Sequence, residues 1–259
     1  MNSGERLFAR YAYAPNDLGY CGPAETAELF ELGATSHSAR SIRPIAERFS
    51  GAWPYAQLLA EVAGIDDPLD ERVMRAYWTG SPLLDAIDRE AFGIKLIDRF
   101  GSEAGHYWAH LTPDLLPEAM PTHGFHVFGV YPWSRLLCGD TAVAALQVLD
   151  NCRIRWGQVE RVDGAHVVVR SERLTWDGRA LALGHPATER VRLSMGGVGF
   201  VDAPVAGEWL ALHWDWVCER LTTQDLDCLQ RWTTWQLSAT NARLASTEPR
   251  RASPPSTNH

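Results

Sequence analysis

The pattern of apolar residues changes once along the chain, close to Cys152. Before this point, apolar side chains recur three or four residues apart in segments separated by glycine and proline, which is typical of short helices. After it, short runs rich in β-branched residues, such as His166–Val169, alternate with Asp-Gly pairs that indicate β-hairpins. The sequence therefore predicts an α+β fold, in which an all-α N-terminal domain precedes a small β domain.

The predicted elements divide the chain into three parts. Helices are expected at 24–32, 42–49 and 53–63, from Pro68, from Ser81 and at 140–149, and strands around 154–162, 166–169, 174–176, 180–183, 190–194 and 209–214. Five or six short strands are enough for a small barrel, and Thr222 with Asp225 predicts the N-terminal cap of a final helix. We expect a helical domain at 1–149, a β-barrel with a C-terminal helix at 150–245, and a polar, disordered tail at 246–259.

Charge and composition argue against two classes of partner. The formal net charge is -8, whereas a nucleic-acid-binding protein more often carries a basic surplus. No apolar run approaches the roughly 18 residues that a membrane span needs, and the N-terminus does not resemble a secretory signal. We therefore expect a cytoplasmic protein that binds neither nucleic acid nor membranes, and whose five cysteines are free thiols.

Two segments flanking the predicted barrel carry a family resemblance. Cys152–Val159 (CRIRWGQV) resembles the opening motif of the HypC family, which runs Cys, two residues, Ile-Pro-Gly, Lys or Gln, Val. Gly207–Val217 (GEWLALHWDWV) resembles a later segment of that family and places its histidine at His213. From Cys152 to about Leu244, the chain is thus similar to HypC/HupF-type [NiFe]-hydrogenase maturation chaperones.

The resemblance implies a fold and a function. HypC-type proteins are small OB-like β-barrels that carry an Fe(CN)2CO unit and pass it to the hydrogenase large subunit, together with the partner HypD. Carried across, the side chains that hold the iron unit would be Cys152 and His213, a thiolate and an imidazole that suit low-spin iron. We expect Arg153 and Arg155 to lower the pKa of the neighbouring thiol and to attract the anionic unit.

The sequence departs from the family pattern at three points. The family cysteine lies at the N-terminus of the chain, whereas Cys152 is internal. Trp156 stands in place of the motif's proline, and Asp215 in place of the glycine that follows the histidine region. A barrel that has kept only a docking role, as a non-catalytic interaction module, is therefore an alternative to iron handling.

The helical domain contains a second group of candidate ligands. Four of the nine histidines, His106, His110, His123 and His126, fall within 21 residues. The first two are four residues apart, so they would share one face of a helix and could bind a metal. No H-E-x-x-H motif is present, which argues against a zinc protease. Either these histidines are ordinary core residues, or the domain is a metal- or haem-dependent enzyme of the same pathway that supplies, for example, a diatomic ligand.

A third candidate is Cys21. It follows the aromatic segment from Tyr11 to Tyr20, which we expect to be a loop, and it precedes a predicted helix. A thiol at the start of a helix has a lowered pKa, so Cys21 is a candidate nucleophile or metal ligand. The sequence assigns it no histidine partner, and we expect an accessory protein rather than an enzyme.

Overall fold

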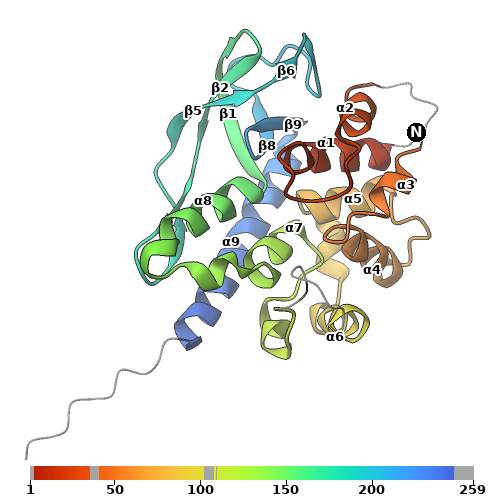
Figure 1. The fold of residues 1–259 in the computed structure, drawn as a ribbon, viewed down its shortest axis with the longest axis vertical. Helices are drawn as coiled ribbons and strands as arrows, with labels where there is room; N and C mark the ends of the chain where they lie inside the picture. Colours follow the sequence, from red (N-terminus) through yellow and green to blue (C-terminus); the bar gives the residue numbers. More distant parts are fainter. Residues whose placement is uncertain (1–2, 36–40, 102–107, 109, 248–259) are drawn as a thin grey trace, which may run out of the picture.

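The computed structural model describes residues 3–35, 41–101, 108 and 110–247. Its N-terminal part is helical, and its C-terminal part contains a mixed sheet followed by one long helix (Figure 1). This order of helices, strands and a final helix confirms the α+β class predicted from the sequence. The predicted tail lies outside the described residues from 248 onward.

The helical part consists mainly of short helices. The α-helices are α1 (Ser3–Asp17), α2 (Thr26–Ala34), α3 (Arg43–Ala46), α4 (Trp53–Ala63), α5 (Glu71–Trp78), α6 (Arg89–Phe100), α7 (His123–Phe125) and α8 (Ala142–Cys152). The 3-10 segments are η1 (Pro82–Ala86), η2 (Pro113–Glu118), η4 (Pro132–Leu136) and η5 (Gly139–Thr141), and η3 (His126–Val130) is a π-helical turn. The prediction for 53–63 is confirmed, and Gly64 ends this helix with a φ of 65°.

Helix α1 corrects one expectation. The segment from Tyr11 was expected to be a loop, but the helix continues through Pro15 to Asp17. Tyr11 and Tyr13 are buried on it, so packing outweighs the helix-breaking tendency of the proline. Because Pro15 has no backbone N–H, it cannot donate to the carbonyl of Tyr11 one turn earlier. That carbonyl is left available to another donor.

The strands form a mixed sheet and two small hairpins. They are β1 (Arg155–Asp163), β2 (His166–Ser171), β3 (Leu174–Trp176), β4 (Leu181–Leu183), β5 (Ala187–Arg192), β6 (Ser194–Met195), β7 (Val198–Gly199), β8 (Trp209–His213) and β9 (Trp216–Leu221). The order in the sheet is β1-β2-β5-β9-β8, and β8 also pairs with β1, so the order closes on itself. The hairpins at Asp163-Gly164 and Asp177-Gly178 are confirmed, whereas β9 was not expected.

The final helix, α9 (Thr223–Thr247), begins as the sequence predicts. The Thr222 hydroxyl accepts a hydrogen bond from the Asp225 backbone N–H at 3.1 Å, and the Asp225 carboxylate accepts one from the Thr222 N–H at 3.1 Å. Among the described residues, no helix has the combination of length and apolar character that crossing a membrane requires.

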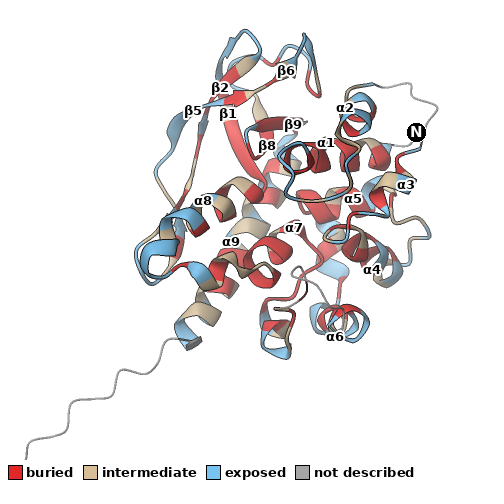
Figure 2. Ribbon diagram, viewed as in Figure 1, coloured by how far each residue is buried: buried red, intermediate tan, exposed pale blue. Residues whose placement is uncertain are grey.

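The two parts share one apolar core. A single cluster of buried residues includes Phe8 of α1, Tyr55 of α4 and Trp216 of β9, and a smaller cluster of valines and leucines lies mostly on the strands of the sheet. Figure 2 shows buried residues along α1 and β1, where the helices meet the sheet. Across this junction, the Tyr11 hydroxyl donates to the Glu219 carboxylate at 2.5 Å. The boundary predicted near residue 150 therefore runs through continuous packing.

Candidate functional site

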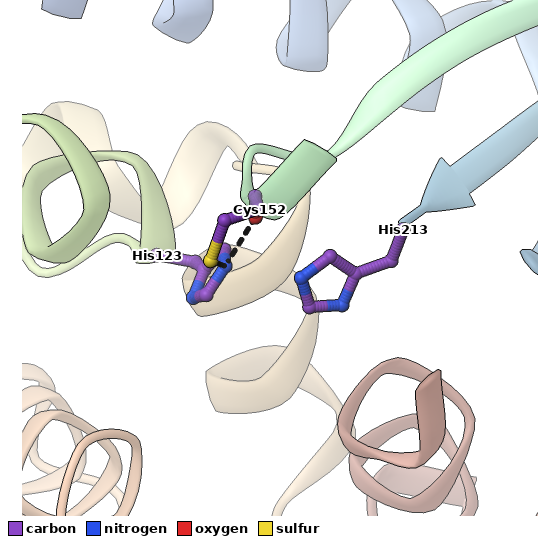
Figure 3. A group of neighbouring side chains, drawn as sticks. All are labelled: His123, Cys152 and His213. Atoms are coloured by element: carbon purple, nitrogen blue, oxygen red, sulfur yellow. Dashed lines mark hydrogen bonds between the residues drawn. The ribbon is translucent and has the colours of Figure 1, made fainter. Parts of the chain in front are cut away.

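Three buried side chains with metal-ligating atoms meet where the helices contact the sheet. His123 begins α7, Cys152 ends α8 and His213 ends β8, and their ligand atoms all lie within 4.8 Å of one another. Figure 3 shows the His213 imidazole pointing toward Cys152 and His123. The structure thus brings together the two residues that the HypC resemblance singles out, and it adds a histidine from the helical part.

The imidazole of His213 is held in the form that binds a metal. Its Nδ1 lies 2.7 Å from the carbonyl oxygen of Tyr11, the carbonyl that Pro15 leaves without a helical donor. A carbonyl can only accept, so Nδ1 carries the proton and Nε2 keeps its lone pair. Nε2 is buried and has no hydrogen-bond partner among the described residues. A metal-ligating histidine typically donates its other ring N–H to such a carbonyl.

His123 needs one proton shift before it can bind through the same atom. Its Nε2 lies 2.8 Å from the carbonyl oxygen of Cys152 and 4.0 Å from the Cys152 Sγ, so in the metal-free protein Nε2 donates to the carbonyl. Its Nδ1 lies 3.4 Å from the hydroxyl of Tyr77. When Nε2 turns to a metal, the proton can sit on Nδ1, where the Tyr77 oxygen accepts it.

The expectation that neighbouring arginines activate Cys152 is wrong. Burial raises the pKa of the Cys152 thiol. Arg153 donates to Asp150 at 2.9 Å, and Arg155 pairs with Glu189 at 3.2 Å, so both guanidinium groups are neutralised by carboxylates. Cys152 is therefore a neutral thiol near pH 7, and a metal must displace its proton.

The two histidines of the cluster are neutral near pH 7. Burial lowers the pKa of His123 to about 4, and the hydrogen bond to the Cys152 carbonyl opposes this only in part. Burial also lowers the pKa of His213 well below its usual range, and the neighbouring His123 adds to the effect. Their lone pairs are therefore not lost to protonation at neutral pH.

The cluster lies in a mostly apolar cavity of about 210 Å³. Its buried floor includes His123, Cys152 and His213 with the aromatic residues Tyr77, Trp78 and Trp214. Its rim is formed by the exposed Tyr20 and by partly exposed residues, among them Trp133 and Cys21. The volume holds several water molecules, or a metal ion with small ligands.

Cys21 lines this cavity but is not an activated thiol. Burial raises its pKa to about 12, which contradicts the expectation of a lowered pKa. The reason is structural: α2 begins only at Thr26, so no helix N-terminus lies next to the sulfur. Cys21 is not part of the three-residue cluster, although it lies in the same cavity.

The four histidines of the helical part do not form one site. His106 lies outside the described residues, and His110 does not line the cavity. Burial and the nearby Arg135 lower the pKa of His110, which is only partly buried. His123 and His126 both line the cavity, and of these only His123 belongs to the cluster. The four histidines therefore do not act together, and only His123 lies with Cys152 and His213.

Two imidazoles and one thiolate suit a borderline transition metal such as zinc, iron, cobalt, nickel or copper. A tetrahedral ion would draw such ligand atoms to about 3.5 Å from one another, so the cluster would contract slightly on binding. Three protein ligands leave at least one position open for a small molecule, as in catalytic and transport sites rather than closed structural ones.

Sequence reasoning missed the link between His123 and the other two residues. No spacing could reveal it, because the contact depends on how α7 packs beside α5 and α9 in the folded chain. A further signal appears only in the backbone: Trp214, directly after His213, has a φ of 55°. A bulky residue in this region is strained, and such strain concentrates at functional sites. Its N–H donates to the carbonyl of Asn151 at 2.8 Å, next to Cys152, so the turn ties the two ligand segments together.

Comparison with known proteins identifies the family but no described function. No curated protein and no solved structure matches the chain. One family model matches residues 1–247, and it therefore covers the helices, the sheet and α9 together. The chain belongs to DUF6390, a family of unknown function.

Proposed function

We propose that this protein is an accessory factor of [NiFe]-hydrogenase maturation that holds an iron unit, Fe(CN)2CO, between Cys152 and His213. One observation carries the proposal: these two residues, chosen from separate motifs that resemble HypC, lie in one buried cluster with free or displaceable lone pairs. The intervening strands, whose order closes on itself, are compatible with the small OB-like barrel that the resemblance implies.

His123 gives the site a third protein ligand from the helical part. In a HypC-like carrier whose cysteine is internal, no terminal amino group is available at the metal, and an imidazole supplies a neutral donor in its place. The remaining coordination positions stay open for cyanide and carbonyl ligands. The helices thus complete the site rather than forming a separate one.

The chemistry of Cys152 suits a carrier that releases its cargo. A buried thiol with a raised pKa binds metal only by losing a proton, and the proton competes to take the sulfur back. A permanently ionised thiolate would hold the same metal more tightly. Transfer to a partner, which we propose is a hydrogenase large subunit or a HypD-like maturation protein, is therefore eased by protonation of Cys152.

An enzyme of the same pathway is the second candidate. The observation that favours it is the open coordination position, which faces a cavity that also contains the imidazole of His126. A metal-bound small molecule could react there. Stoichiometric metal in the purified protein with turnover of a small substrate would favour the enzyme, and metal without turnover would favour the carrier.

The test is co-purification from cells that make a [NiFe]-hydrogenase. Wild-type protein is expected to bring down the hydrogenase large subunit or a maturation protein, with iron and infrared bands of cyanide and carbonyl. Cys152→Ser and His213→Ala should lose the iron and the bands. Cys218→Ser, another buried cysteine outside the cavity, is the matched control and should keep them. Equal hydrogenase activity with and without the gene would refute the proposal.

A further inference from the structure

The cavity contains a buried polar group that the metal cluster does not use, the imidazole of His126. Only 2% of this residue is exposed, and its Nε2 is buried without a hydrogen-bond partner among the described residues. His126 lies one helical turn after His123, so both side chains project toward the same side of the α7–η3 segment and line the same cavity.

The local backbone is unusual at this position. The helix widens to a π-helical turn at η3, in which the Tyr131 N–H donates to the His126 carbonyl at 2.9 Å. Single π-turns occur frequently at functional sites. The ring is held by aromatic neighbours on several sides, with the rings of Tyr55, Trp108 and Tyr131 centred 5.2, 5.7 and 4.2 Å away.

Hydrogen bonding favours one position of the His126 ring proton when a ligand that accepts hydrogen bonds occupies the cavity. The Tyr55 hydroxyl lies 3.2 Å from His126 Nδ1, and this is the only polar contact of the buried hydroxyl among the described residues. If the hydroxyl donates to Nδ1, Nε2 carries the proton, and an acceptor in the cavity then completes the hydrogen bonding of both ring nitrogens. The reverse arrangement leaves a buried hydroxyl proton without an acceptor, which is costly. His126 thus presents an N–H, whereas His213 presents a lone pair.

Glycine at position 51 keeps the space beside this N–H open. A Cβ at Gly51 would lie 3.0 Å from His126 Nε2 and 3.5 Å from the Tyr131 hydroxyl oxygen. Gly51 lines the cavity and is partly exposed, so the space connects His126 with the cavity and its rim.

We infer that His126 and Gly51 form a second subsite of the cavity, where the His126 N–H donates a hydrogen bond to the outer atom of a small linear anion, such as cyanide, bound to the metal by its other end. The inference rests on the proposed metal site and adds its ligand recognition. In a cavity with only apolar walls, such an anion would be held by the metal alone. A hydrogen-bond donor in the wall favours ligands whose outer atom accepts a hydrogen bond.

Azide binding to the Co²⁺-loaded protein tests this. Azide is a linear anion whose outer nitrogen accepts hydrogen bonds, and Co²⁺ reports both its own binding and that of azide by absorption. His126→Phe should weaken azide binding at least tenfold and change Co²⁺ affinity less than threefold. His126→Gln, which keeps an N–H donor, should recover part of the loss, and the exposed His185→Phe should change neither affinity.

Gly51→Ala provides an independent variant if His126→Phe does not fold. Its methyl group would occupy the space beside Nε2, so azide binding should weaken although the imidazole is intact. Equal azide affinity in wild type and both variants, with Co²⁺ bound, would overturn the second subsite and leave the metal site standing. Failure of wild-type protein to bind Co²⁺ would overturn both.

Discussion

Arg75 of α5 links the helical part to β9 and α9, next to the site, and its removal should lower the free energy of unfolding. Its guanidinium group lies 3.3 Å from Glu219 of β9 and 3.1 Å from Asp225 of α9. The Glu219 side chain is only 7% exposed, and its other partner is the Tyr11 hydroxyl. Arg75→Ala would leave a buried carboxylate with one neutral donor. Breaking a buried pair costs about 3–5 kcal/mol, and since Arg75 is one-quarter exposed we expect about 2–3 kcal/mol of unfolding free energy.

Denaturant unfolding of a double-mutant cycle measures this coupling. Glu219→Gln removes the charge that Arg75 neutralises, so the double variant should be at least 1 kcal/mol more stable than the sum of the two single losses predicts. Burial raises the pKa of Glu219 while Arg75 opposes the rise, so Arg75→Ala should raise it further. A raised folded-state pKa means that stability falls as pH rises above 4.5. The free energy of unfolding lost in Arg75→Ala should therefore be smaller at pH 5 than at pH 8. Additive losses that do not depend on pH would refute this account.

Four further outcomes follow from the site. Pro15→Ala adds an N–H that competes with His213 for the Tyr11 carbonyl, so titration should show Co²⁺ affinity lowered several-fold; unchanged affinity would contradict the role of the proline. Because a bound metal displaces one proton from Cys152, the affinity for Co²⁺ should rise about tenfold per pH unit between pH 6 and 8. A Co²⁺ affinity that does not change with pH would exclude the thiol as a ligand. Burial lowers the pKa of His126 below its unfolded value, so the free energy of unfolding should fall as pH drops below about 6.5, by up to about 1.4 kcal/mol per pH unit. Denaturant unfolding of His126→Gln should show a weaker dependence of this free energy on pH. Cys152→Ser should abolish the sulfur-to-cobalt absorption band, whereas Cys218→Ser should keep it.

Local signals predicted much of the fold. The helix at 53–63, the two Asp-Gly hairpins and the cap at Thr222 depend on neighbouring residues, and each is present. Helix α1 was missed because Pro15 resembles a breaker, although the buried face of the helix compensates for it. Strand β9 was missed because it follows β8 after only a two-residue turn at Trp214 and Asp215.

The site could be predicted only in part. The motifs containing Cys152 and His213 pointed to one pair of residues, and the structure places them together. His123 joins them because α7 packs beside α5 and α9, which no spacing in the sequence records. The charges of Arg153 and Arg155 were misleading, because their pairing with Asp150 and Glu189 depends on tertiary contacts.

X-ray absorption of the zinc-loaded protein tests the central claim most directly. The account predicts one sulfur at about 2.3 Å and two imidazole nitrogens at about 2.0 Å, with the remaining coordination filled by small ligands. Cys152→Ser should remove the sulfur, and His123→Ala or His213→Ala should remove one nitrogen each, while Cys218→Ser should change nothing. A zinc site without sulfur in the wild-type protein, or one that keeps its sulfur in Cys152→Ser, would contradict the account.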